Sequence, residues 1–235
     1  MSSSSPSFSV ILITTLPPLA PGDAAAAGVK IDGRESLLKA VELFLNRDNI
    51  HQVLLAFTPE FAEEGKRKFG GHLSFSGVKV VSGGPKWVDQ IVAAAEKLSE
   101  KATHVIVHDA ARPAVPYDDI DALLDAAPKH PIACLTAPVR SALFELDEGG
   151  QPVALHAAKR YAQMLLPLSI ARSRFDQLIK SKQEPHASEY SLIKGSGLNL
   201  RVGGGQDASL VRAMIGLLPK PKVKPPSSPF EEAQW

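Results

Sequence analysis

Apolar residues follow two alternating patterns along this chain. Five short runs rich in Val, Ile and Leu have the character of strands buried on both faces of a sheet, and they cover residues 10–13, 52–57, 78–81, 105–107 and 132–136. Between the runs, apolar residues recur at helical spacing, first from Ser36 and later from Trp87. Strands that alternate with helices predict an α/β fold with a single doubly wound, mostly parallel sheet, covered on both sides.

Residues 140–160 break this alternation. Two short apolar segments, 143–146 and 152–156, flank Asp147-Glu148-Gly149-Gly150, which is typical of a hairpin turn. The pattern alone allows a hairpin exposed to solvent. Beyond it we expect a helix over 170–179, short strands at 192–195 and 198–202, and a last helix capped by Asp207.

Composition narrows the class of protein. The chain has 235 residues and a net charge of +1, so it offers no basic excess for nucleic acid, and its apolar runs are too short to span a membrane. The single cysteine, Cys134, lies in an apolar run, and we expect a buried thiol in a reducing cytoplasm. We predict a disordered leader over 1–8, one α/β domain over 9–218 and a mobile Pro-rich tail over 219–235.

The most informative stretch is THVIVHDAARPAVP, residues 103–116. Asp109 follows a buried β-branched run, at the carboxyl end of a strand, where open α/β sheets bind ligands. Asp109 could hold Mg²⁺ on the phosphates of a nucleotide, while Arg112 grips a second anionic group. In the alternative interpretation, Asp109 and Arg112 simply pair with each other in a turn at the strand end.

His-Asp-Ala-Ala-Arg-Pro after a Val/Ile strand resembles the signature of 2-C-methyl-D-erythritol 4-phosphate cytidylyltransferases, which transfer CMP from CTP to a sugar-alcohol phosphate in isoprenoid synthesis. The resemblance runs from about Ser9 to Leu218. It implies a nucleotidyltransferase-like fold, CTP or another nucleotide and a sugar-alcohol phosphate as ligands, and Mg²⁺ at Asp109. It also implies a homodimer that forms through the hairpin arm. The nucleotide-binding residues would be Gly83, Gly84, His108 and Ala110.

The resemblance places further cations on the sugar-phosphate side. Pro138-Val139 matches the family pattern before the arm, and Lys159 or Arg160 corresponds to an arginine that follows it. Arg201 stands where the family has a phosphate-binding lysine. Together with Arg112, these residues are the expected substrate-binding group; unrelated surface charges are the alternative.

The first loop departs from the family. The arginine of the family's loop corresponds to a position near Leu19, and the family's lysine corresponds to Ala26. Two cations that stabilise the charge on the α-phosphate are therefore missing. Lys30 and Lys86 are the candidate catalytic replacements, together with Arg34. The alternative for Lys30 and Arg34 is that they are solvated surface residues.

A second departure follows the third strand, where Trp87 and Gln90 replace an arginine and a serine. We expect Trp87 to be a core residue because of its helical spacing with Ile91. The sequence therefore supports two hypotheses: a nucleotidyltransferase with impaired activity, or a non-catalytic homologue that binds a nucleotide, a sugar phosphate or a protein partner.

Overall fold

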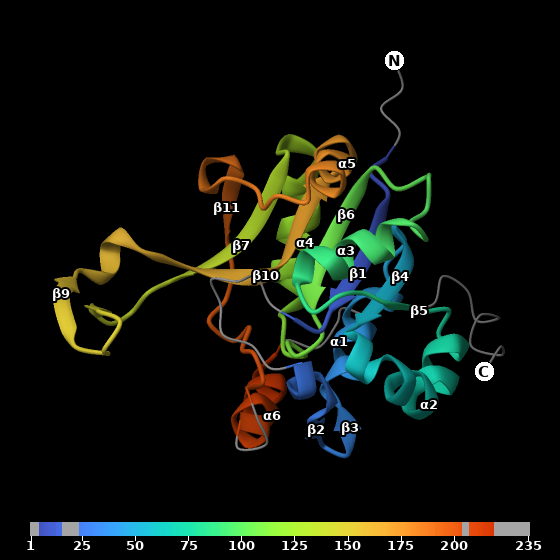
Figure 1. Cartoon of the computed structure of the whole chain (residues 1–235), viewed down its shortest axis with the longest axis horizontal. Helices are drawn as coiled ribbons and strands as arrows, with labels where there is room; N and C mark the ends of the chain where they lie inside the picture. Colours follow the sequence, from blue (N-terminus) through green and yellow to red (C-terminus); the bar gives the residue numbers. More distant parts are fainter. Residues whose placement is uncertain (1–4, 16–23, 204–206, 219–235) are drawn as a thin grey trace, which may run out of the picture.

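The computed structural model describes residues 5–15, 24–203 and 207–218, and its centre is a seven-stranded sheet in the order β11-β7-β10-β6-β1-β4-β5 (Figure 1). All neighbouring strands pair in parallel except β10, which runs antiparallel to both β6 and β7. The strands of the sheet are β1 (Phe8–Ile13), β4 (Ile50–Phe57), β5 (Lys79–Ser82), β6 (His104–Asp109), β7 (Ile132–Pro138), β10 (Ala162–Ala171) and β11 (Tyr190–Lys194). The predicted α/β class and mostly parallel sheet are confirmed.

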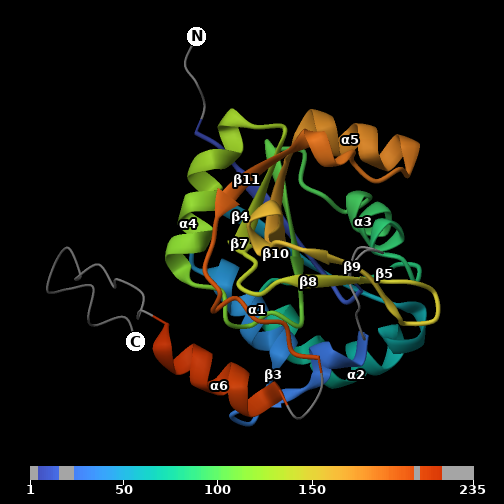
Figure 2. The same ribbon diagram turned by 90° about the vertical axis from the view of Figure 1, so that its left-hand side faces the viewer.

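Helices cover both faces of the sheet (Figures 1 and 2). One face carries α1, α2 and α4, and the other carries α3 and α5. The α-helices are α1 (Ser36–Leu45), α2 (Pro59–Phe75), α3 (Trp87–Ala95), α4 (Tyr117–Ala126), α5 (Arg172–Ser181) and α6 (Ala208–Leu217). Short 3₁₀ turns are η1 (Ala24–Gly28), η2 (Ala127–Lys129), η3 (Ala158–Arg160) and η4 (Ala187–Glu189).

The buried strand β1 shows why the apolar runs predicted strands correctly. Its alternate residues Phe8, Val10 and Leu12 pack under α1, while Ile11 and Ile13 pack under α3. Because successive side chains of a strand point to opposite faces, a sheet covered on both sides requires apolar residues at every position.

Strand β10 was not predicted, although it lies in the middle of the sheet. Its segment carries Pro167, which cannot donate to a strand ladder. The pairing with β7 is interrupted between Met164 and Leu168, where that missing donor is tolerated. The expected helix over 170–179 is confirmed from Arg172 as α5, while Ile170 and Ala171 belong to β10. The expected strand over 198–202 is wrong, because this segment is irregular.

Two hairpins extend from the sheet. Strands β8 (Leu143–Leu146) and β9 (Pro152–His156) form the predicted hairpin, which projects away from the domain (Figure 1). A smaller hairpin joins β2 (Lys30–Ile31) to β3 (Arg34–Glu35) through an Asp-Gly turn and packs against α6. Within the described residues, no helix combines the length and the apolar character that crossing a membrane requires.

Candidate functional site at the end of the central strand

The carboxylate of Asp109 ends β6 and is fully buried. Its Oδ1 accepts a hydrogen bond of 2.8 Å from the backbone N–H of Ala111, and its Oδ2 accepts one of 2.8 Å from Nε of Arg201. Nε of Arg112 lies 3.7 Å from the same Oδ2. The carboxylate thus faces two guanidinium groups, one of them 92 residues away in the sequence.

Backbone contacts bring the distant segment to the strand end. The N–H of Val202 donates to the carbonyl of Ala111 at 2.8 Å. Nη1 of Arg112 donates to the carbonyl of Asn199 at 2.9 Å, and the Asn199 amide donates to the carbonyl of Leu166 at 2.6 Å. Asn199 and Arg112 are both buried. We call Asp109, Arg112, Asn199 and Arg201 the strand-end cluster.

Burial also sets the protonation of groups at the strand end. It lowers the pKa of Arg112, and the neighbouring Asp109 carboxylate opposes that shift. Burial lowers the pKa of His108 to about 3, so its imidazole is neutral at pH 7. The net charge of the strand-end cluster is therefore set by one carboxylate and two guanidinium groups.

The residues expected to bind the nucleotide already have partners within the chain. Nε2 of His108 contacts the carbonyl of Arg112 at 3.0 Å, and the N–H of Ala110 donates to the carbonyl of Ile13 at 2.9 Å. The N–H of Gly83 donates to the carbonyl of Phe57 at 2.9 Å.

The glycines after β5 also have a packing role. A Cβ on Gly83 would lie 2.5 Å from Cα of Gln90, and a Cβ on Gly84 would lie 2.7 Å from Cβ of Asp89. Both glycines thus allow α3 to approach the strand end closely.

The other predicted cations lie apart from the strand-end cluster. Lys30 is on the β2–β3 hairpin, where its Nζ lies 3.9 Å from a carboxylate oxygen of Glu35 and its side chain is 62% exposed. Lys86 is the exposed N-cap residue of α3. Lys159 and Arg160 belong to η3, between β9 of the arm and β10, and are exposed. Only Arg112 and Arg201 of the expected substrate-binding cations meet at Asp109.

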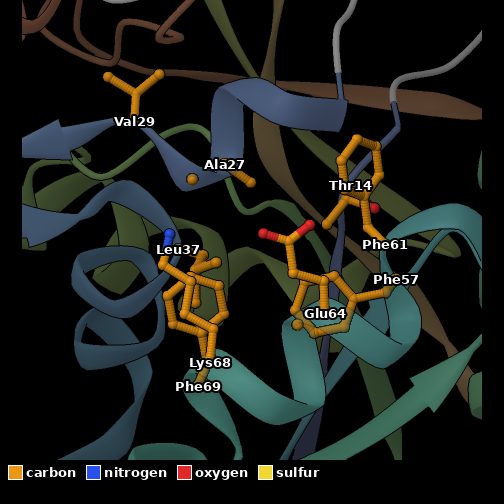
Figure 3. Close-up of a pocket in the computed structure, with 11 residues that line it drawn as sticks. Thr14, Ala27, Val29, Leu37, Phe57, Phe61, Glu64, Lys68 and Phe69 are labelled. Carbon is orange, nitrogen blue, oxygen red and sulfur yellow. The ribbon is translucent and has the colours of Figure 1, made fainter.

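Two cavities flank this end of the sheet. One, of about 290 Å³, lies between η1, α1 and α2, and Figure 3 shows its mostly apolar wall with Glu64 and Lys68 among the lining residues. The other, of about 770 Å³, lies between the base of the arm, the loop after β11 and α6, and Arg140 lines it. Arg140 was not predicted as a site residue from the sequence, although this arginine directly follows Pro138-Val139, which matches the family pattern.

Comparison with known proteins identifies the family. The family model of 2-C-methyl-D-erythritol 4-phosphate cytidylyltransferase (IspD) matches residues 23–214, most of the chain. This chain belongs to the 2-C-methyl-D-erythritol 4-phosphate cytidylyltransferase family. A relative so named from Vibrio atlanticus is 32% identical over 141 residues, and the match spans 56% of this chain and 55% of that protein. A relative from Vibrio vulnificus is 27% identical over 201 residues, covering 77% of this chain and 83% of the relative.

Solved structures of cytidylyltransferases share the fold. The Anaerococcus prevotii 4-diphosphocytidyl-2C-methyl-D-erythritol synthase superposes with a TM-score of 0.72 at 11% identity, covering 90% of this chain and 97% of that one. The Francisella tularensis 2-C-methyl-D-erythritol 4-phosphate cytidylyltransferase gives a TM-score of 0.68 at 16% identity, covering 88% and 99%. At these identities the likeness establishes the nucleotidyltransferase-like fold.

The positions where this chain departs from the cytidylyltransferase pattern are filled by packing residues. Ala26, at the position of the family's lysine, is 1% exposed, whereas Leu19 lies outside the described residues. Trp87 is buried in the core, as predicted, and donates to Glu184 at 2.8 Å. Gln90 is buried, and its amide oxygen accepts from the N–H of Thr14 at 2.9 Å. These side chains are therefore part of the packed interior and not charged groups at the surface.

The strand-end cluster does not fit a metal ion in this arrangement. Mg²⁺ takes near-octahedral oxygen ligands, usually with one or two protein carboxylates among them. Both oxygens of Asp109 are engaged, and no group of three or more metal-binding side chains occurs in the described part of the chain. Mg²⁺ bound at Asp109, as the resemblance implies, would lie next to the guanidinium groups of Arg112 and Arg201, which would repel it.

Proposed function

We propose that this protein binds CTP and a sugar-alcohol phosphate and transfers CMP between them, with weaker catalysis than its family pattern would give. In that reaction a phosphate oxygen of the acceptor attacks the α-phosphorus of CTP, and the bond to the β-phosphate breaks to release pyrophosphate. The proposal places the reaction in isoprenoid-precursor synthesis, in a reducing cytoplasm. It rests on family membership and on the strand-end cluster.

The observation that carries the proposal is the meeting of Arg112 and Arg201 at Asp109. Guanidinium groups bind phosphate oxygens in a bidentate manner, and they stabilise the charge that develops during phosphoryl transfer. Their place at the carboxyl end of a central strand is where open α/β sheets accept ligands. Nη2 of Arg112 makes no hydrogen bond to another described residue, so it could donate one to a phosphate oxygen.

Reduced catalysis follows from the missing cations. The family's lysine position holds the buried, uncharged Ala26, and Lys30 is already paired with Glu35. Loss of one positioned stabiliser typically raises the barrier by about 3–4 kcal/mol, or roughly 10²–10³ in rate. We therefore propose that Lys86, which is exposed and two residues after Gly84, supplies a remaining cation to the triphosphate.

The arm supplies the proposed dimer contact. Phe144 is 65% exposed and Leu155 64% exposed on its two strands, and further exposed apolar residues are Leu143, Leu146 and Val153. A two-stranded hairpin with so much apolar surface is marginal by itself and is stabilised by packing against a partner. We propose that the arm joins two copies of this chain, with Lys159 and Arg160 facing the acceptor phosphate at the partner's site.

The test is turnover by the intact protein. Incubation with CTP, Mg²⁺ and 2-C-methyl-D-erythritol 4-phosphate should release pyrophosphate slowly, and Asp109→Asn should abolish the release. Asp125→Asn, at an exposed carboxylate of α4, is the matched control and should turn over like the wild type. Absence of pyrophosphate with CTP and with the other three nucleoside triphosphates would exclude the enzyme.

A second candidate is a non-catalytic homologue that binds a nucleotide, a sugar phosphate or a protein partner. It is favoured by the burial of Ala26 and by Gln90, which is buried and accepts a hydrogen bond from the N–H of Thr14. A thermal shift with CTP or CMP in the absence of turnover would select this candidate over the enzyme.

A further inference from the structure

The strand-end cluster carries an excess of positive charge. Two guanidinium groups, of Arg112 and Arg201, face the single carboxylate of Asp109, so the cluster has a net charge of +1. His108 beside it is buried, with its Nε2 in contact with a backbone carbonyl, and its imidazole is neutral at pH 7 and adds no charge. A divalent cation would enter a region where two guanidinium groups already face one carboxylate, so it would be repelled there more than an anion.

The geometry places Arg201 where a metal would coordinate. Its Nε lies 2.8 Å from Oδ2 of Asp109, and its Nη1 donates to the carbonyl of Val202 at 3.2 Å. The remaining oxygen, Oδ1, is held by the N–H of Ala111. The nearby carbonyl of Asn199 accepts from Arg112, and the Asn199 Oδ1 lies 3.4 Å from the same nitrogen. The oxygen atoms that a metal would need are therefore already paired with nitrogen donors.

We propose that Arg201 serves as a built-in cation at Asp109, so that this protein binds the phosphate groups of its nucleotide through arginine without a divalent metal. The proposal rests on the proposed nucleotide site and changes its chemistry. Guanidinium and metal ions both neutralise phosphoryl oxygens, but the guanidinium is permanently charged and covalently attached. Ligand affinity would then depend on Arg201 and on ionic strength, with no dependence on Mg²⁺.

The first measurement is the affinity for CTP by calorimetry, in EDTA and in Mg²⁺. We expect dissociation constants that agree within about threefold, since the bound phosphates meet arginine in both cases. Arg201→Gln should weaken binding at least tenfold in EDTA, and Arg201→Lys, which keeps the charge, should recover part of it. Arg67→Gln, at an exposed arginine of α2, is the matched control and should bind like the wild type. A wild-type affinity more than tenfold weaker in EDTA would overturn the proposal.

The second measurement needs neither activity nor nucleotide. Mn²⁺ is titrated into the protein, and the electron paramagnetic resonance signal of the free ion reports how much is bound. Wild type and Asp109→Asn should bind the same amount of Mn²⁺, because no ion is held at Asp109. Bound Mn²⁺ in the wild type that disappears in Asp109→Asn would overturn the proposal, even if CTP failed to bind. Failure to bind CTP in both EDTA and Mg²⁺ would instead overturn the proposed function, and the Mn²⁺ result would then decide the role of Arg201. Thermal melts of each variant confirm that it is folded.

Discussion

The carboxyl end of β6 and the hairpin arm differ in the surroundings of their side chains. At the end of β6, buried polar groups are paired with one another: Asp109 with Arg201, and Arg112 with Asn199. On the arm, the large apolar residues are left in solvent, with Phe144 and Leu155 both mostly exposed. In the first region most buried polar groups have partners, although Arg112 Nε and His108 Nδ1 have none among the described residues, whereas the second region exposes large apolar side chains.

This difference separates two kinds of region. In the HDAARP segment, Asp109 accepts a hydrogen bond from the N–H of Ala111, and Nε2 of His108 contacts the carbonyl of Arg112. On the arm, the polar contacts are exposed: Asp147 accepts from the N–H groups of Gly149 and Gln151, and Glu145 contacts His156 at 2.8 Å. Substitutions at the strand end should therefore change folding stability, and substitutions on the arm should change assembly.

The largest expected effect is at Asp109. Asp109→Ala would leave Arg112 and Arg201 without a carboxylate in a buried site, which typically costs about 3–5 kcal/mol of the free energy of unfolding. Urea denaturation followed by circular dichroism measures the change, with Asp125→Ala as the exposed control. A loss below about 1 kcal/mol would mean that the network is not a structural unit.

The packing of α3 on the end of β5 gives the next effect. Gly83→Ala would place a methyl group 2.5 Å from Cα of Gln90, and we expect a loss of about 1–3 kcal/mol as the helix is displaced. Gly70→Ala, in α2 with no heavy atom near the new methyl group, should instead stabilise by about 0.5–1 kcal/mol. Equal effects of the two substitutions in urea denaturation would contradict the packing role of Gly83.

The arm should show the converse behaviour. Replacing Phe144 and Leu155 together with serine should raise the dissociation constant of the proposed dimer about 10–100-fold, or ~1.4–2.7 kcal/mol. Sedimentation equilibrium measures it, and the free energy of unfolding of the monomer should change by less than about 0.5 kcal/mol. Phe75→Ser, at an exposed aromatic of α2, is the control. A wild-type monomer at high concentration would remove the arm from any role in assembly.

The smallest effect concerns pH. Burial lowers the pKa of His108 to about 3, below its unfolded value of about 6.5, so between these values only the unfolded chain binds the proton. Stability from this group is present above pH 6.5 and is lost as the pH falls below it, by about 1 kcal/mol between pH 6.5 and 5.5.

His108→Gln should flatten that part of the pH profile of unfolding, whereas His51→Gln, at an exposed position, should leave it unchanged. An identical slope in wild type and His108→Gln would show that the pKa of His108 does not differ between the folded and the unfolded protein.

The local pattern of apolar residues predicted the secondary structure correctly where burial alone sets that pattern. The β-branched run before His108 gave a buried strand, and the apolar stripe through Trp87 and Ile91 gave a core helix. Cys134 is buried as expected, and burial raises the pKa of its thiol to about 12. Strand β10 was missed because Pro167 masks it locally, and its place depends on pairing with β6 and β7.

The sequence by itself determined the α/β class, the family and three candidate residues of the strand-end cluster, Asp109, Arg112 and Arg201, because apolar periodicity and the family motifs are read from the local sequence. Only the tertiary structure decided that Arg201, rather than Lys30 or Lys159, pairs with Asp109. It also decided that Gly83 and Ala110 use their N–H groups on neighbouring strands. These outcomes depend on contacts between distant segments in a buried environment, where each polar group must find a partner that no local pattern specifies.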